Sequence, residues 1–120
     1  MTTLAAGVFK ALGHPVRVAM IEALRSGPLC VCEFMPLLGI EQPTASKHIA
    51  VLRREGLIMA EKDGQRTMCR LADDTVAAIY DQVRGFLRER WLRQSALWGD
   101  LPAGAGGPTR EEPGREEAES

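Results

Sequence analysis

Segments with a helical repeat of apolar residues alternate with short glycine- and proline-containing breaks over the first part of the chain. A first helix, apolar on one side, is expected to end at Gly13. His14 and Pro15 then open a second helix, because proline fits the first turn of a helix. That helix is apolar nearly all round, which is typical of a buried central helix. A Ser-Gly-Pro break at residues 26–28 ends it.

Two further helices are predicted at residues 29–38 and 42–55, with a short turn at residues 39–41 that begins with Gly39. Two helices joined by so short a glycine-containing turn form a helix-turn-helix pattern. The pattern alone does not establish DNA binding, since many such helical corners bind nothing.

Residues 57–62 and 66–71 read as two strands, and Asp63-Gly64 between them is a strong signal for a tight hairpin. A hairpin that directly follows a helix-turn-helix is a wing. The last helix, at residues 74–97, carries a long apolar stripe that one small domain cannot cover. The fold expected is α+β and mainly α: a winged helix-turn-helix of about five helices and a β-hairpin wing, homodimeric through its first and last helices.

Charge divides the 120-residue chain into two parts. Residues 1–98 hold 13 Lys and Arg against 10 Asp and Glu, and are expected to form the DNA-binding and dimerisation domain. Residues 99–120 hold two Arg against six acids, together with five Gly and three Pro. This composition predicts a disordered acidic tail.

The fourth helix, drawn at about 100° per residue, turns Ala45, Ile49 and Leu52 toward the core. Small and polar residues lie on the opposite face and suit a DNA major groove, with basic residues placed to meet phosphates. The hairpin tip is expected to grip flanking phosphates or the minor groove. The alternative is an ordinary solvated helix face, but the presence of the wing favours the DNA-binding interpretation. The residues expected to contact DNA are Gln42, Thr44, Ser46, Lys47, His48 and Arg54 from the helix, and Lys62, Gln65 and Arg66 from the hairpin tip.

Two segments resemble the ArsR/SmtB family of metalloregulatory repressors. Residues 9–17 (FKALGHPVR) are similar to the family's opening signature, and residues 42–52 (QPTASKHIAVL) are similar to its recognition helix. Glu41 stands where the family usually has a capping serine, and a carboxylate can also cap a helix. The resemblance covers about residues 8–83 and implies a dimeric, winged helix-turn-helix repressor of double-stranded operator DNA.

Residues 29–34 (LCVCEF) closely resemble the Leu-Cys-Val-Cys-Asp-Leu segment of arsenite- and antimonite-responsive members. Thiolates are soft ligands and suit thiophilic ions, and a helix N-terminus favours the thiolate form. Cys30 and Cys32 are therefore the expected ligands of As(III) or Sb(III), which act as inducers; DNA binding itself needs no metal. The alternative is that two buried cysteines simply pack as small apolar residues.

The spacing of the two cysteines predicts how the inducer acts. Two residues apart on a helix, their side chains would point about 200° apart, so one ion could hold both only by unwinding the first turn. Arsenic sensors of the family often carry a further cysteine where this chain has Met35. Cys69 in the second hairpin strand is the candidate third ligand, with packing in the core as the alternative; water or a cellular thiol could also complete the site.

Other functions are less compatible with the sequence. Zinc, nickel and cobalt sensors of the family use His and carboxylate ligands on the last helix, which has no histidine here; His14 and His48 lie elsewhere. A thiol-redox or persulfide sensor, or a cadmium or lead sensor, of the same fold remains open. So does a protein-interaction module built on the last helix.

An enzyme is not expected, because no residue is placed to activate a cysteine nucleophile. Neither a signal peptide nor the roughly 18 unbroken apolar residues of a membrane span is visible. Three cysteines without a secretion signal suggest reduced thiols, so a cytoplasmic protein with no membrane partner is expected.

Overall fold

The computed structural model describes residues 1–98, and the predicted acidic tail lies outside them. The chain divides into two compact units, Met1–Tyr80 and Asp81–Ser120. The first unit contains the first four predicted helices, the wing and the start of the last helix. The second is described only up to Trp98, as the continuation of the last helix.

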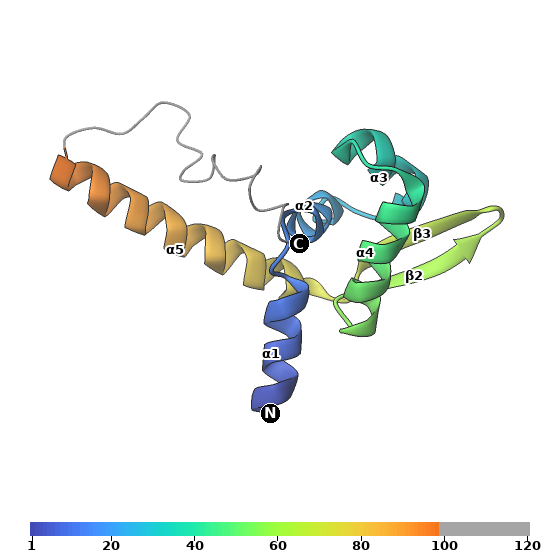
Figure 1. Cartoon of the computed structure of the whole chain (residues 1–120), viewed down its shortest axis with the longest axis horizontal. Helices are drawn as coiled ribbons and strands as arrows, with labels where there is room; N and C mark the ends of the chain where they lie inside the picture. The colour runs from blue at the N-terminus through green and yellow to red at the C-terminus, as the bar shows by residue number, and fades with distance from the viewer. Residues whose placement is uncertain (99–120) are drawn as a thin grey trace. The chain divides into compact units, whose positions relative to one another are not determined.

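The elements follow one another in the predicted order, with one addition (Figure 1). They are α1 (Thr2–Ala11), α2 (Pro15–Leu24), β1 (Leu29–Cys30), α3 (Val31–Leu38), α4 (Gln42–Arg54), β2 (Ile58–Asp63), β3 (Arg66–Leu71) and α5 (Asp74–Trp98). In Figure 1, α4 runs beside the β2–β3 hairpin, and α3 lies next to α4. The winged helix-turn-helix architecture predicted from the sequence is confirmed.

A three-stranded antiparallel sheet, in the order β1-β3-β2, replaces the predicted two-stranded hairpin. In the wing, Asp63 pairs with Arg66, so the turn residues are Gly64 and Gln65. Gly64 has φ of +71°, a left-handed conformation that a residue without a Cβ adopts at little cost. The hairpin prediction is thus correct, with the turn one residue later than Asp63-Gly64.

The prediction of one helix over residues 29–38 is wrong at its start. Leu29 pairs with Cys69 and Cys30 pairs with Met68, so these two residues form β1 and α3 begins only at Val31. The apolar repeat could not reveal this, because Leu and Cys fit either element and the pairing partner lies almost 40 residues further along the chain.

The core of the first unit lies where the helices pack on one another and on the sheet. Phe34 of α3 and Met20 of α2 are fully buried, and the expected inward face of α4 is buried as predicted. The buried apolar residues are Ala11, Met20, Ile21, Leu24, Phe34, Ala45, Ile49, Leu52, Leu57, Ile58, Cys69 and Val76.

A polar cluster joins α4 to the helices before it. His48 of α4 is only 9% exposed, and its Nδ1 lies 3.1 Å from Nη1 of Arg17 on α2. Arg17 also donates to the main-chain oxygens of Ala11 (2.6 Å) and Lys10 (3.3 Å). The rings of His48 and His14 contact each other at a tilt of 48°, with their centroids 4.5 Å apart. One guanidinium thus connects the end of α1, α2 and α4.

His14 begins α2 as the sequence predicts. Its Nδ1 accepts a hydrogen bond from the N–H of Val16 at 3.1 Å, and Pro15 occupies the first helical position. The ring satisfies a donor that a helix start would otherwise leave unpaired.

The described part of the second unit is helical and displays several large apolar side chains. They are Val83, Phe86, Leu87 and Leu92. In the described residues of the chain, no single helix has the length and hydropathy needed to cross a membrane. The pair α1 and α2 meets that test only together, across an 87° bend.

The burial of His48 predicts an acid-sensitive fold. Burial, and then the charges of His14, Arg17 and Lys47, lower the pKa of His48 to about 4. The unfolded chain therefore binds a proton below about pH 6.5 that the folded chain does not bind until about pH 4. Stability should be complete above pH 6.5 and fall by up to about 3 kcal/mol as the pH drops to 4.

Urea unfolding of the parent and of His48→Gln, measured from pH 7.5 to pH 4, tests this expectation. Glutamine can still accept from Arg17 but does not titrate, so its stability should change less over that interval. Equal loss of stability in the two proteins would contradict the assignment.

Candidate nucleic-acid interface and cysteine pair

The outer face of α4 has the exposed side chains that the sequence analysis placed there. Gln42, Thr44, Ser46, Lys47 and Arg54 are all exposed. Ser46 and Ala50 keep the middle of this face small, so another surface can approach the helix closely. The face therefore has the shape and chemistry of a helix that enters a major groove.

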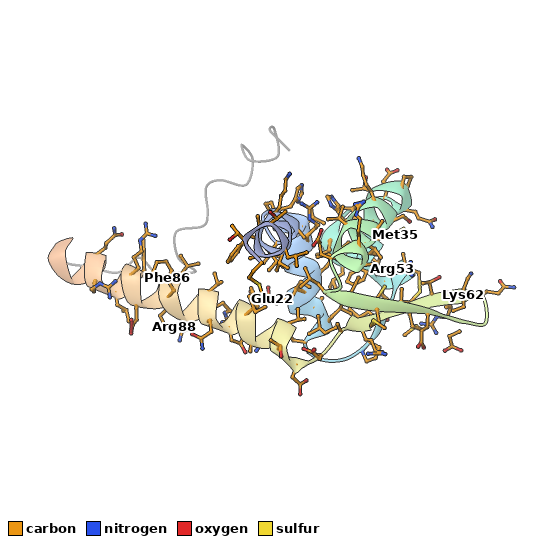
Figure 2. All side chains as sticks on the ribbon, turned by 90° about the horizontal axis from the view of Figure 1, so that it is seen from below. Glu22, Met35, Arg53, Lys62, Phe86 and Arg88 are labelled. Carbon is orange, nitrogen blue, oxygen red and sulfur yellow. A yellow bond between two sulfur atoms is a disulfide. The ribbon has the colours of Figure 1, made fainter. Side chains whose placement is uncertain are left out.

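The tip of the wing is polar and basic. Lys62, Gln65 and Arg66 are exposed at or beside the turn. Figure 2 shows Lys62 near the far end of the hairpin, with its side chain directed away from the strands. This is the position from which cations can contact a nucleic-acid backbone.

His48 is the exception among the residues expected to contact DNA, and that expectation is wrong. Its ring lies in the interior against Arg17 and His14, so it cannot reach base edges. The helical wheel places it on the flank of α4, but a wheel does not show that α2 covers that flank.

Glu41 occupies the N-cap position of α4, yet its carboxylate makes no capping hydrogen bond with the described residues. The expectation that it can replace the usual serine is therefore not met. Pro43 at the second helical position has no N–H, which removes one of the two donors that a capping side chain uses.

Cys30 and Cys32 lie together, contrary to the expected separation of about 200° for two helical residues. Cys30 is the N-cap of α3 with an extended backbone (φ −72°, ψ 146°), and only Cys32 is helical. Their Cα atoms are 5.0 Å apart and their sulfur atoms are joined as a disulfide. The helical rule fails here because an N-cap side chain folds back over the first turn. The pair is thus preformed, and no unwinding is needed to bring the sulfurs together.

The start of α3 has a capping box in which cysteine takes the usual place of serine. The N–H of Cys32 donates to Sγ of Cys30 at 3.0 Å, and the N–H of Cys30 donates to Oε1 of Glu33 at 2.6 Å. Pro36 lies inside this short helix and cannot donate to the carbonyl of Cys32 four residues earlier. The first turn of α3 is therefore well capped but lacks one internal hydrogen bond at Cys32.

A cavity of about 360 Å³ borders the cysteine pair. Its walls come from the start of α3, from α4 and from the wing. The stripe of α4 that lines it is Gln42, Ser46, Ile49, Ala50 and Arg53, and the remaining lining residues are Cys30, Val31, Cys32, Met35, Ala60, Gln65, Arg66 and Thr67. Figure 2 labels Met35 on α3 and Arg53 on α4, one lining residue of this cavity from each helix.

The candidate third ligand, Cys69, is not brought to the pair. Its side chain is fully buried in the core, and burial raises the pKa of its thiol, opposed by the charge of Arg53. Within residues 1–98, no three His, Cys, Asp or Glu side chains cluster closely enough to hold a metal ion. Met35 does share the cavity with the pair.

Two reduced cysteines at this position fit a thiophilic ligand, since both sulfurs are adjacent and the side chain of Cys32 is exposed. The two cysteines provide two strong ligands, and Met35 adds one weak thioether. This set is too small for a closed four-thiolate site and compatible with an ion that takes few ligands.

Arg53 is a lining residue that the sequence analysis missed. A signal was available: residues 42, 46, 49, 50 and 53 follow one another at helical spacing along a single stripe. Without the position of the wing, nothing distinguished this stripe from the rest of the polar face.

An exposed helix face with small residues at its centre, next to a basic wing on a three-stranded sheet, defines a winged helix-turn-helix DNA-binding protein. A family model described as the bacterial regulatory proteins of the arsR family matches residues 14–60. The chain is 34% identical over 93 residues to the arsenic resistance transcriptional regulator ArsR1 of Pseudomonas putida, covering 75% of this chain and 73% of that protein. The chain therefore belongs to the ArsR family of transcriptional regulators, DNA-binding proteins that are not enzymes.

Two further proteins are similar to this chain. The transcriptional repressor SmtB of Mycobacterium tuberculosis is 38% identical over 72 residues, which are 60% of this chain and 53% of SmtB. The solution structure of the homodimeric winged helix-turn-helix domain Mb0332 of Mycobacterium bovis has a TM-score of 0.70 and 28% identity, covering 74% of this chain and 82% of that one.

Proposed function

We propose that this protein is a homodimeric cytoplasmic repressor that leaves its operator when As(III) or Sb(III) binds the thiolates of Cys30 and Cys32. The observation that carries the proposal is the cavity shared by the cysteine pair, the recognition helix and the wing. The name of the Pseudomonas relative, an arsenic resistance regulator, adds support.

The shared cavity suggests how ligand binding opposes DNA binding. A metalloid on the pair occupies space next to Gln42 and Ser46, which are proposed to read bases, and next to Arg66, which is proposed to hold a phosphate. The ligand then acts by filling the gap between recognition helix and wing rather than by separating the two sulfurs. By linkage, DNA must weaken metalloid binding by the same factor.

A second candidate function is a thiol-redox sensor, which the disulfide between Cys30 and Cys32 favours. Oxidation removes two electrons and two protons from the pair, and a disulfide no longer offers thiolates to a metalloid. With the disulfide present, α3 and α4 keep their helix-turn-helix arrangement. Oxidation is therefore expected to block the arsenite response while leaving the DNA-binding surface intact.

The proposed DNA contacts predict a specific effect of Gln42→Ala. Loss of a base-reading side chain should cost about 1–3 kcal/mol of operator binding and relax sequence preference. Lys47→Gln should instead weaken binding to all sequences alike and reduce the salt dependence. Fluorescence anisotropy with DNA from upstream of the protein's own coding region measures both. If Gln42→Ala binds as tightly and selectively as the parent, α4 does not read bases as proposed.

The cysteine pair predicts that induction needs both thiols. Cys30→Ser keeps a good N-cap acceptor, so this variant and Cys32→Ser should fold and bind the operator. Each should require at least about tenfold more arsenite for release, because a single thiolate holds the ion weakly. The measurement is release of labelled operator DNA by arsenite from the reduced proteins.

Cys69→Ser is the matched control, since Cys69 is buried away from the pair; it should respond like the parent. Release of operator DNA is measured in the same way with diamide, cadmium or lead in place of arsenite. Full arsenite response in the Cys30→Ser/Cys32→Ser double variant would refute the proposed site. Retained operator binding after diamide, together with loss of the arsenite response, would favour the redox sensor.

Exposed apolar side chains on α1 and α5 predict a homodimer. Phe9 of α1 is 72% exposed and Phe86 of α5 is 58% exposed, and a stable fold gains by covering such groups. Because a two-fold interface repeats each residue, Phe86→Lys should weaken dimerisation by about a hundredfold or more. Leu37→Lys, at an exposed apolar position of α3, should leave the dimer intact. Sedimentation equilibrium at micromolar concentration checks this; a monomeric parent would exclude the dimer.

A further inference from the structure

The cavity beside the cysteine pair is larger than a metalloid needs. Its volume is about 360 Å³, whereas a water molecule occupies about 30 Å³ in the liquid. Cavities of this size typically bind small organic molecules. An arsenic atom on Cys30 and Cys32 would leave most of the space free for a second ligand.

The charged residues that line the cavity are both cations, so the lining favours an anionic ligand. It contains the guanidinium groups of Arg53 and Arg66 and the amides of Gln42 and Gln65, and no carboxylate among the described residues. Arginine binds carboxylates through paired, charge-assisted hydrogen bonds. The two arginines come from α4 and from β3, so they approach the cavity from different elements.

The coordination of arsenic also leaves a place for an outside ligand. Trivalent arsenic forms three bonds, and the pair supplies two thiolates. The thioether of Met35 is a weak donor, and Cys69 is absent from the described lining of the cavity. A third strong ligand must then come from solution.

We propose that the cavity binds a small carboxylate-bearing thiol together with the metalloid, the thiolate completing the arsenic coordination and the carboxylates pairing with Arg53 and Arg66. The inference rests on the proposed function, since it requires arsenite at Cys30 and Cys32. Arsenous acid, two protein thiols and one small thiol exchange three As–O bonds for three As–S bonds. Each thiol proton leaves with a hydroxide as water, and no electrons are transferred.

The test compares two thiols on the reduced full-length protein. The disulfide is first reduced with a phosphine, which is removed anaerobically. Arsenite is then titrated with no thiol, with glutathione, which carries two carboxylates, or with uncharged 2-mercaptoethanol at equal thiolate concentration. Near-ultraviolet As–thiolate absorption gives the affinity, and native mass spectrometry gives the composition of the complex. Glutathione should tighten arsenite binding by about tenfold more than 2-mercaptoethanol, with one glutathione per arsenic.

Substitution of the two arginines tests whether they cause the tighter arsenite binding with glutathione. Arg53→Gln and Arg66→Gln should each lose most of the glutathione advantage while binding arsenite with 2-mercaptoethanol as the parent does. Arg70→Gln is the control, because Arg70 is also an exposed arginine of β3 but does not belong to the described lining. It should keep the full advantage.

The outcomes separate the two proposals. Equal enhancement by both thiols, or an undiminished glutathione advantage in Arg53→Gln and Arg66→Gln, overturns this inference and leaves arsenite binding at the pair standing. A complex without glutathione does the same. No arsenite binding under any condition overturns the proposed function and this inference together.

Discussion

The pairing of Leu29 and Cys30 with β3 is the constraint on which the arrangement of the site depends. It keeps Cys30 extended, so that α3 starts only at Val31 and the sulfur of Cys30 turns back over the first helical turn. The same pairing ties the start of α3 to the central strand of the wing. The cysteine pair is therefore joined to the wing through the pairing of β1 with β3, and the proposed ligand would bind where the wing joins the rest of the domain.

Residues on one stripe of α4 belong both to the proposed DNA-binding surface and to the lining of the cavity. Gln42 and Ser46 face the surface that suits a major groove, and they also border the cavity next to the thiols. Arg66 does the same on the wing. DNA needs these groups exposed and the gap between helix and wing open to the duplex, whereas a bound metalloid needs the gap for itself. In the proposed function, overlap of the two sites gives mutual exclusion without a signal relayed through the domain.

The sequence predicted the order of the helices, the wing, and both faces of α4, because each depends on local periodicity or on turn chemistry. Three features could not be predicted from the sequence. β1 needs a partner 40 residues away, the burial of His48 depends on α2 covering the flank of α4, and the meeting of Cys30 with Cys32 follows from β1. All three are tertiary contacts. The wrong prediction that the two cysteine side chains point apart follows directly from the missed strand β1.

Different contacts hold α4 on its two sides. This difference determines which part of the domain a thiophilic ligand can displace. On the inner side, Arg17 bonds two main-chain oxygens and lies against His48, contacts that a soft ion does not disturb. On the other side, α3 packs against α4 beside the cavity, and Pro36 removes a hydrogen bond at Cys32, in the first turn of α3. On the inner side, apolar packing adds to the contact between Arg17 and His48, whereas the side with the cysteines has space and a first turn that lacks one hydrogen bond. Displacement on metalloid binding is therefore expected in the first turn of α3 and in the wing, with α4 remaining fixed to α2.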